Sequence, residues 1–157
     1  PQEACASRVE MAPSASENSS ANGKVALLYG ALVIRAKSDD ELALLAGHEI
    51  AHNILGHDAR IRKQKIDTDF LPLLGIGDSR LRDMERDADS LGIWLAALAG
   101  YDYKIAPKYF SDITKRSGIG AYWPTTHPTA RNRFRNAAVT VAKIDLQRLE
   151  QVVDPAD

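Results

Sequence analysis

The residues best able to do chemistry in this sequence are two histidines and a glutamate within residues 48–52, which read His-Glu-Ile-Ala-His. Positions i and i+4 of a helix lie on one face, so His48 and His52 can direct both imidazoles at one metal ion. Glu49 is rotated away from that face and can reach a water beside the metal without being a ligand. This is the H-E-x-x-H zinc pattern, with the glutamate as general base. The alternative is a solvated helix that carries two histidines by chance.

A third metal ligand must come from elsewhere, because catalytic zinc usually has three protein ligands and one open position. Cys5, the only cysteine, lies far upstream in a segment that we expect to be irregular. His57 falls on a different face of a continuous helix from His52. The glycine and third histidine of the longer H-E-x-x-H-x-x-G-x-x-H pattern are also absent. We therefore interpret His57 as a surface residue near the helix end.

A second cluster offers carboxylates. Residues 83–92 read Asp-Met-Glu-Arg-Asp-Ala-Asp-Ser-Leu-Gly and lie in a predicted helix from about 79 to 99. Glu85 and Asp89 are four positions apart and point the same way. One can bind the metal while the other accepts the N–H of a ligating imidazole. A charged, solvent-facing turn is the alternative, but small and apolar residues on another face of this helix indicate burial and favour the metal site.

Three motifs in this order resemble the gluzincin peptidases of the HtpX and CAAX-prenyl-protease type, a family that also includes periplasmic BepA-like proteases. They are His-Glu-Ile-Ala-His, Glu-Arg-Asp-Ala-Asp-Ser-Leu-Gly and Thr-His-Pro, and the resemblance runs from about residue 22 to residue 135. The resemblance implies zinc as cofactor, with the following roles: His48, His52 and Glu85 as ligands, Glu49 as general base and Asp89 as acceptor for an imidazole N–H.

The third motif carries two further expectations. In the family, a histidine and an arginine of this segment face the active site and stabilise the transition state, which the resemblance implies for His127 and Arg133. A structural alternative stays open, in which Thr126 or His127 caps a helix with Pro128 in its first turn.

The resemblance implies a zinc-dependent endopeptidase that hydrolyses protein or peptide substrates, in protein quality control and at a periplasmic or membrane-associated location. We expect the substrate to lie extended along the strand near residues 24–29. Two other functions are considered: a zinc-binding but non-catalytic chaperone or interaction module of the same fold, and a zinc hydrolase of small amides or esters. The intact Glu49 argues against the non-catalytic alternative.

Composition agrees with one small domain. The chain has 157 residues, of which 45% are hydrophobic and 26% charged, enough for one core. A net charge of −1 gives no electrostatic reason to bind nucleic acid or an anionic membrane. No apolar run has the length of a membrane span. The single cysteine excludes an internal disulfide, and the start at Pro1 suggests an excised or processed domain.

We predict a mostly helical α+β domain of the zincin type, with a short strand segment before the active-site helix. Residues 1–23 are expected to be an irregular lead-in and residues 24–157 the zinc metallopeptidase domain. The expected elements are one or two strands over 24–34, helices over 39–65, 79–99 and 102–117, and a last helix over 129–152. Ser38 and Glu41 make a capping box for the first helix. The last helix is expected to turn these apolar side chains inward: Phe134, Val139, Val141, Ile144, Leu146 and Leu149.

Overall fold

The computed structural model describes residues 7–15, 19–66, 79–116 and 128–153. Its helices and strands, in chain order, are β1 Arg8–Ala12, β2 Ser19–Ala21, β3 Val25–Tyr29, α1 Gly30–Arg35, α2 Asp39–Ile54, α3 His57–Gln64, α5 Ser79–Leu98, the 3-10 helix η1 Tyr103–Ile105, α6 Ala106–Arg116 and α7 Ala130–Val153. The predicted mostly helical α+β class is confirmed.

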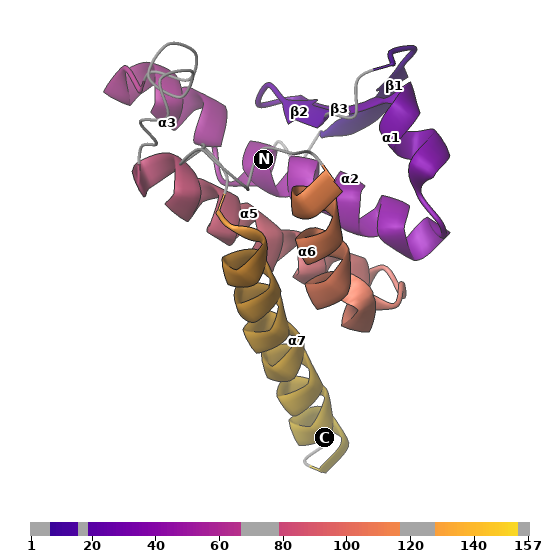
Figure 1. The fold of residues 1–157 in the computed structure, drawn as a ribbon. Coiled ribbons are helices and arrows are strands. Elements are labelled where there is room, and N and C mark those ends of the chain that lie inside the picture. The colour runs from indigo at the N-terminus through magenta and orange to yellow at the C-terminus, as the bar shows by residue number, and fades with distance from the viewer. Residues whose placement is uncertain (1–6, 16–18, 67–78, 117–127, 154–157) are drawn as a thin grey trace.

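The sheet has three strands in the order β1-β3-β2, so β3 is the central strand. β1 pairs with β3 in parallel, with Arg8 opposite Val25, and β2 pairs in antiparallel fashion, with Ser19 opposite Leu28. Ala26 and Leu28 of β3 are buried, and Leu28 belongs to the main core. The sheet lies against α2 at one end of the molecule (Figure 1).

The expectation of an irregular N-terminal segment was wrong, because residues 1–23 supply β1 and β2. Of the one or two strands expected over 24–34, one is present as β3, and residues 30–35 form the helix α1. Most of β1 is exposed. Both edge strands are held by backbone pairing to β3. Their sequences show little of the hydrophobic alternation by which a strand is predicted.

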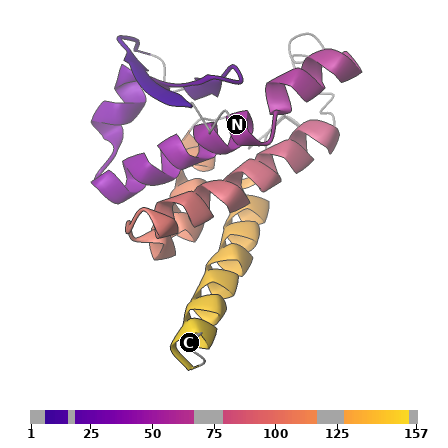
Figure 2. The same ribbon diagram turned by 180° about the vertical axis from the view of Figure 1, so that it is seen from behind.

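The helices α2 and α5 lie side by side in both views (Figures 1 and 2), because two glycines allow their backbones to touch. A Cβ atom built on Gly47 would lie 2.7 Å from the carbonyl oxygen of Gly92. Ser38 caps α2 as predicted, accepting a hydrogen bond from the backbone N–H of Glu41 at 3.3 Å. The close approach brings the motif on α2 next to the carboxylates of α5.

The single helix predicted over 39–65 is two helices. α2 ends at Ile54, and a turn at Leu55 and Gly56 separates it from α3. Gly56 has φ +63°, a left-handed conformation that glycine adopts without the strain of a side chain. The chain therefore changes direction directly before His57.

The last helix, α7, follows the predicted bounds but not the predicted packing. Ile144 is fully buried and Val141 packs on the main core. Four of the side chains expected to face inward are 46% to 61% exposed: Phe134, Val139, Leu146 and Leu149. For the two in the C-terminal half of α7, Leu146 and Leu149, the reason is visible in Figures 1 and 2, where this half extends beyond the other helices.

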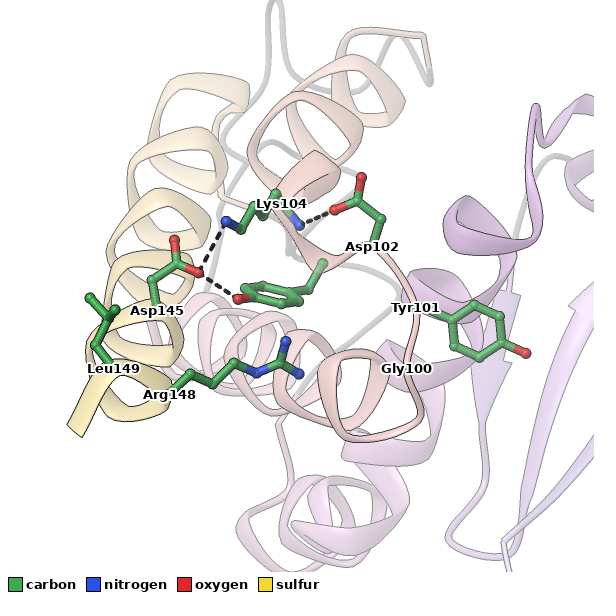
Figure 3. A pocket seen from close by; sticks show the side chains of 8 residues that line it. Gly100, Tyr101, Asp102, Lys104, Asp145, Arg148 and Leu149 are labelled. Carbon is green, nitrogen blue, oxygen red and sulfur yellow. Dashed lines mark hydrogen bonds and ion pairs between the residues drawn. The ribbon is translucent and has the colours of Figure 1, made fainter. Parts of the chain in front are cut away.

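A polar cluster anchors the far part of α7 to the end of α5 (Figure 3). The guanidinium of Arg148 lies 4.8 Å from the ring centroid of Tyr103 and donates a hydrogen bond of 2.8 Å to the carbonyl of Ala97. The hydroxyl of Tyr103 donates to Asp145, which also lies 3.5 Å from the amine of Lys104. The side chains of this cluster (Tyr103, Lys104, Asp145 and Arg148) line a surface cleft of about 670 Å³. Among the helices that the structure describes, none is long and apolar enough to cross a membrane.

Substituting Gly47 by alanine tests the contact between the two helices. Helix propensity alone would stabilise this variant by about 1 kcal/mol. The clash with Gly92 should outweigh this gain and lower the free energy of unfolding by about 1–3 kcal/mol, measured by chemical denaturation. Gly30→Ala is the matched control, because its Cβ would meet Ala12 at an ordinary 3.5 Å. Equal stability of the two variants would contradict the contact.

Candidate metal centre

Three donor groups converge between α2 and α5. The Nε2 atoms of His48 and His52 are 3.1 Å apart. The carboxylate oxygens of Glu85 lie 3.6 Å from Nε2 of His48 and 3.4 Å from Nε2 of His52. One ligand atom from each residue lies within 4.8 Å of the other two. The structure therefore brings together the residues expected to be ligands, with the Nε2 atom of each imidazole facing the group.

Asp89 lies behind this group and contacts the other side of His48. Its Oδ1 atom is 2.8 Å from Nδ1 of His48, and the residue is only 1% exposed. Burial alone would lower the pKa of His48, but the hydrogen bond and charge of Asp89, with the charges of Glu85 and Glu49, raise it to about 9. The carboxylate thus fixes the ring orientation, so that Nε2 points at Glu85.

Arg133 of α7 is buried and binds Asp89 in a bidentate ion pair. Its Nε atom donates to Oδ2 of Asp89 at 2.7 Å, and Nη2 donates to Oδ1. Nη1 lies 3.4 Å from the hydroxyl of Thr114, and the guanidinium carbon lies 4.6 Å from the ring centroid of Phe110. Burial would raise the pKa of Asp89, but the Arg133 charge and the hydrogen bonds from His48 and Arg133 hold it below its usual value. These contacts indicate that Arg133 positions Asp89, whereas its expected transition-state role stays a prediction.

The other part of the third motif lies outside the described residues, which include neither Thr126 nor His127. The role expected for His127 therefore stays a prediction. The structural alternative for this segment was wrong, however, because α7 begins at Ala130 and the hydroxyl of Thr129 accepts the backbone N–H of Asn132 at 3.3 Å. Thr129 is the cap of this helix.

Glu49 has a partner that the sequence did not reveal. Its side chain is buried, and its Oε1 accepts a hydrogen bond of 2.6 Å from the hydroxyl of Ser19 on β2. A serine thirty positions before the glutamate, in a segment expected to be irregular, gave no signal in the sequence. The contact joins the predicted general base to the edge of the sheet.

The interpretation of His57 as a surface residue was wrong. It is 1% exposed, and its Nδ1 atom lies 3.0 Å from Nδ1 of His52. Burial, followed by the charges of His52 and Arg60, lowers the pKa of His57 to about 4. The error came from extending α2 through this position. The turn at Gly56 instead returns His57 to His52 of the candidate metal centre.

A comparison with characterised proteins relates this sequence to a known enzyme. Over 131 residues the sequence is 32% identical to the mitochondrial metalloendopeptidase OMA1 of Arabidopsis thaliana. The chain is similar to a metalloendopeptidase. The match covers 72% of this chain and 27% of the length of that protein. No protein-family model matches the chain, and no solved structure matches it. The similarity supports a metallopeptidase, while the narrower resemblance to HtpX, CAAX-prenyl and BepA-like proteases stays a prediction.

The contact between Asp89 and His48 can be tested by Asp89→Asn. We expect the affinity for Zn²⁺ to fall about 10- to 100-fold, because the imidazole loses its charged acceptor, measured by competition with a chromophoric chelator. Asp87→Asn on the same helix is the control, since Asp87 is exposed and pairs with Arg86. Unchanged affinity in the Asp89 variant would contradict the role assigned to this carboxylate.

Proposed function

We propose that this chain is a zinc-dependent endopeptidase of the gluzincin class, with a zincin-type fold, that hydrolyses peptide bonds in protein substrates. One observation carries the proposal: the Nε2 atoms of His48 and His52 meet the carboxylate of Glu85 beside the buried carboxylate of Glu49, in a chain similar to a metalloendopeptidase. A structural helix would have no reason to bury this set of polar groups together.

The donor set fits zinc. Two nitrogen ligands of a tetrahedral zinc site are separated by about 3.3 Å, given the usual Zn–N distance. The 3.1 Å between the Nε2 atoms of His48 and His52 is close to that value. His48, His52 and Glu85 would hold the ion, which when bound would polarise the scissile carbonyl and lower the pKa of a bound water.

Glu49 directly follows the first ligand, and its carboxylate contacts Ser19 of β2, so it lies on the side of the site that faces the sheet. We assign to it the proton transfers: it accepts a proton from the attacking water and delivers it to the amine that leaves. The hydrogen bond from Ser19 holds this carboxylate in one orientation. A buried base with a fixed orientation is well suited to both transfers.

The expected position of the substrate needs a correction. A peptide cannot pair with residues 24–29, because β3 already pairs with β1 on one side and β2 on the other. β2 is an edge strand, and its Ser19 contacts Glu49. We therefore place the substrate backbone along β2, where added-strand hydrogen bonds would bind it with little demand on sequence.

The expected role in protein quality control and the expected periplasmic or membrane-associated location stay predictions. What the site supports is cleavage of an extended, unfolded chain. Hydrolysis of small amides or esters without cleavage of a denatured protein would favour a small-molecule hydrolase. Zinc binding without any hydrolysis would favour the non-catalytic module.

Zinc content tests the ligand assignment. The purified chain should bind close to one zinc ion, as expected for one three-ligand site, and chelation should remove it reversibly. His48→Ala, His52→Ala and Glu85→Ala should each lower occupancy sharply, measured by elemental analysis at a fixed free zinc concentration. Glu10→Ala on the exposed β1 strand should retain the full content. A Glu85 variant with unchanged affinity would remove Glu85 from the ligand set.

Glu49→Gln tests the general base. Glutamine keeps the size and polarity of the side chain but accepts no proton, so cleavage of a denatured protein should fall by about 10²- to 10⁴-fold. Zinc content should stay normal, which separates loss of the base from loss of the metal. The matched control is Glu10→Gln. Proteolysis at the normal rate in the zinc-loaded Glu49 variant would refute the mechanism.

A further inference from the structure

The two histidines of the metal centre have different partners on their outer nitrogens. Nδ1 of His48 meets the carboxylate of Asp89 at 2.8 Å, which is a common arrangement for a metal-bound imidazole. Nδ1 of His52 instead meets Nδ1 of His57 at 3.0 Å. The rings of His52 and His57 are nearly perpendicular, with centroids 4.9 Å apart.

Two Nδ1 atoms at hydrogen-bond distance need one donor and one acceptor, so one proton lies between them. If His57 donates, the neutral His52 must carry its own proton on Nε2, which then has no lone pair for a metal. If His57 accepts, His52 carries its proton on Nδ1 and the lone pair of Nε2 faces His48 and Glu85. The tautomer of His57 thus decides whether His52 can be a ligand.

We infer that His57 is a positioning residue of the metal centre: its Nδ1 accepts a hydrogen bond from Nδ1–H of His52 and so holds His52 in the tautomer that binds metal through Nε2. The inference rests on the proposed ligation by His52. It adds a residue outside the H-E-x-x-H motif to the machinery of the site.

The local fold holds His57 in this position. It is the first residue of α3, directly after the left-handed turn at Gly56, and it is almost completely buried. Its Nε2 atom is also buried and has no hydrogen-bond partner among the described residues. Among the described residues, His52 is therefore the hydrogen-bond partner of the His57 ring. A neutral acceptor also adds no further negative charge to a site that already holds Glu49, Glu85 and Asp89.

Two substitutions separate a hydrogen-bond role from a packing role. His57→Phe keeps a planar ring of similar size but offers no acceptor. His57→Asn loses ring volume but places its amide oxygen close to the position of Nδ1. If His57 only fills space, phenylalanine is the better replacement. If it holds the tautomer of His52, asparagine is the better replacement.

The experiment measures the affinity of each chain for Zn²⁺ by competition with a chromophoric chelator, and the unfolding temperature of each chain without added metal. We expect His57→Phe to bind Zn²⁺ about 10-fold more weakly or worse, and His57→Asn to stay within about threefold of the unaltered chain. Equal affinity of the phenylalanine variant and the unaltered chain would overturn the inference. The inference would also be overturned if both variants bound Zn²⁺ weakly and the loss of affinity in each followed the fall in its unfolding temperature.

A measurement on the unaltered chain covers the case in which both variants fail to fold. Nitrogen-15 NMR of the imidazoles in the Zn²⁺-loaded chain should show Nδ1 of His57 unprotonated and Nε2 protonated. The opposite tautomer would overturn the inference. If instead the unaltered chain binds Zn²⁺ no better than His48→Ala, the proposed function fails and the role of His57 fails with it. Failure of the inference alone leaves zinc binding by the unaltered chain intact.

Discussion

The carboxylate of Asp89 lies in the interior between the guanidinium of Arg133 and the imidazole of His48, and the candidate site depends on this contact. A carboxylate without water is costly unless a partner of opposite charge and well-aligned hydrogen bonds compensate the desolvation. Arg133 supplies both through two of its nitrogens. The result links three helices through polar atoms, since His48 belongs to α2, Asp89 to α5 and Arg133 to α7. The position of a predicted ligand is thereby set by a residue at the far end of the chain.

The second requirement is the distance between α2 and α5. Side chains at Gly47 or Gly92 would separate the two backbones, because a Cβ on either residue would lie 2.7 Å from backbone atoms of the other helix. Donor groups on neighbouring helices meet only if the helices keep this spacing. Packing and chemistry are thus connected here, and the small residues near the motif act on the site without touching its polar atoms.

The sequence was most informative where local spacing carries the information. The i, i+4 relations placed the two histidines, and Glu85 with Asp89, on the correct faces, and the N-terminal cap at Ser38 was also recognised. It failed where the geometry depends on turns and distant pairing. The αL turn at Gly56 returned His57 to the site, and the contact between Ser19 and Glu49 depends on strand pairing across thirty residues. Burial of α7 was overestimated, and for Leu146 and Leu149 the reason is that the helix continues beyond the elements that cover it.

The distribution of the site along the chain also bears on how the molecule is made. His48 precedes Asp89 by about forty residues, and Arg133 follows Asp89 after a similar interval. A ribosome releases the N-terminal part first, and long-range contacts form only after the intervening chain has been closed into a loop. The nascent chain therefore contains both histidines and the glutamates of the centre before Arg133, the cation that pairs with Asp89, has been synthesised. Until α7 is synthesised and docked, Asp89 lacks its guanidinium partner, so the complete centre is a late product of folding.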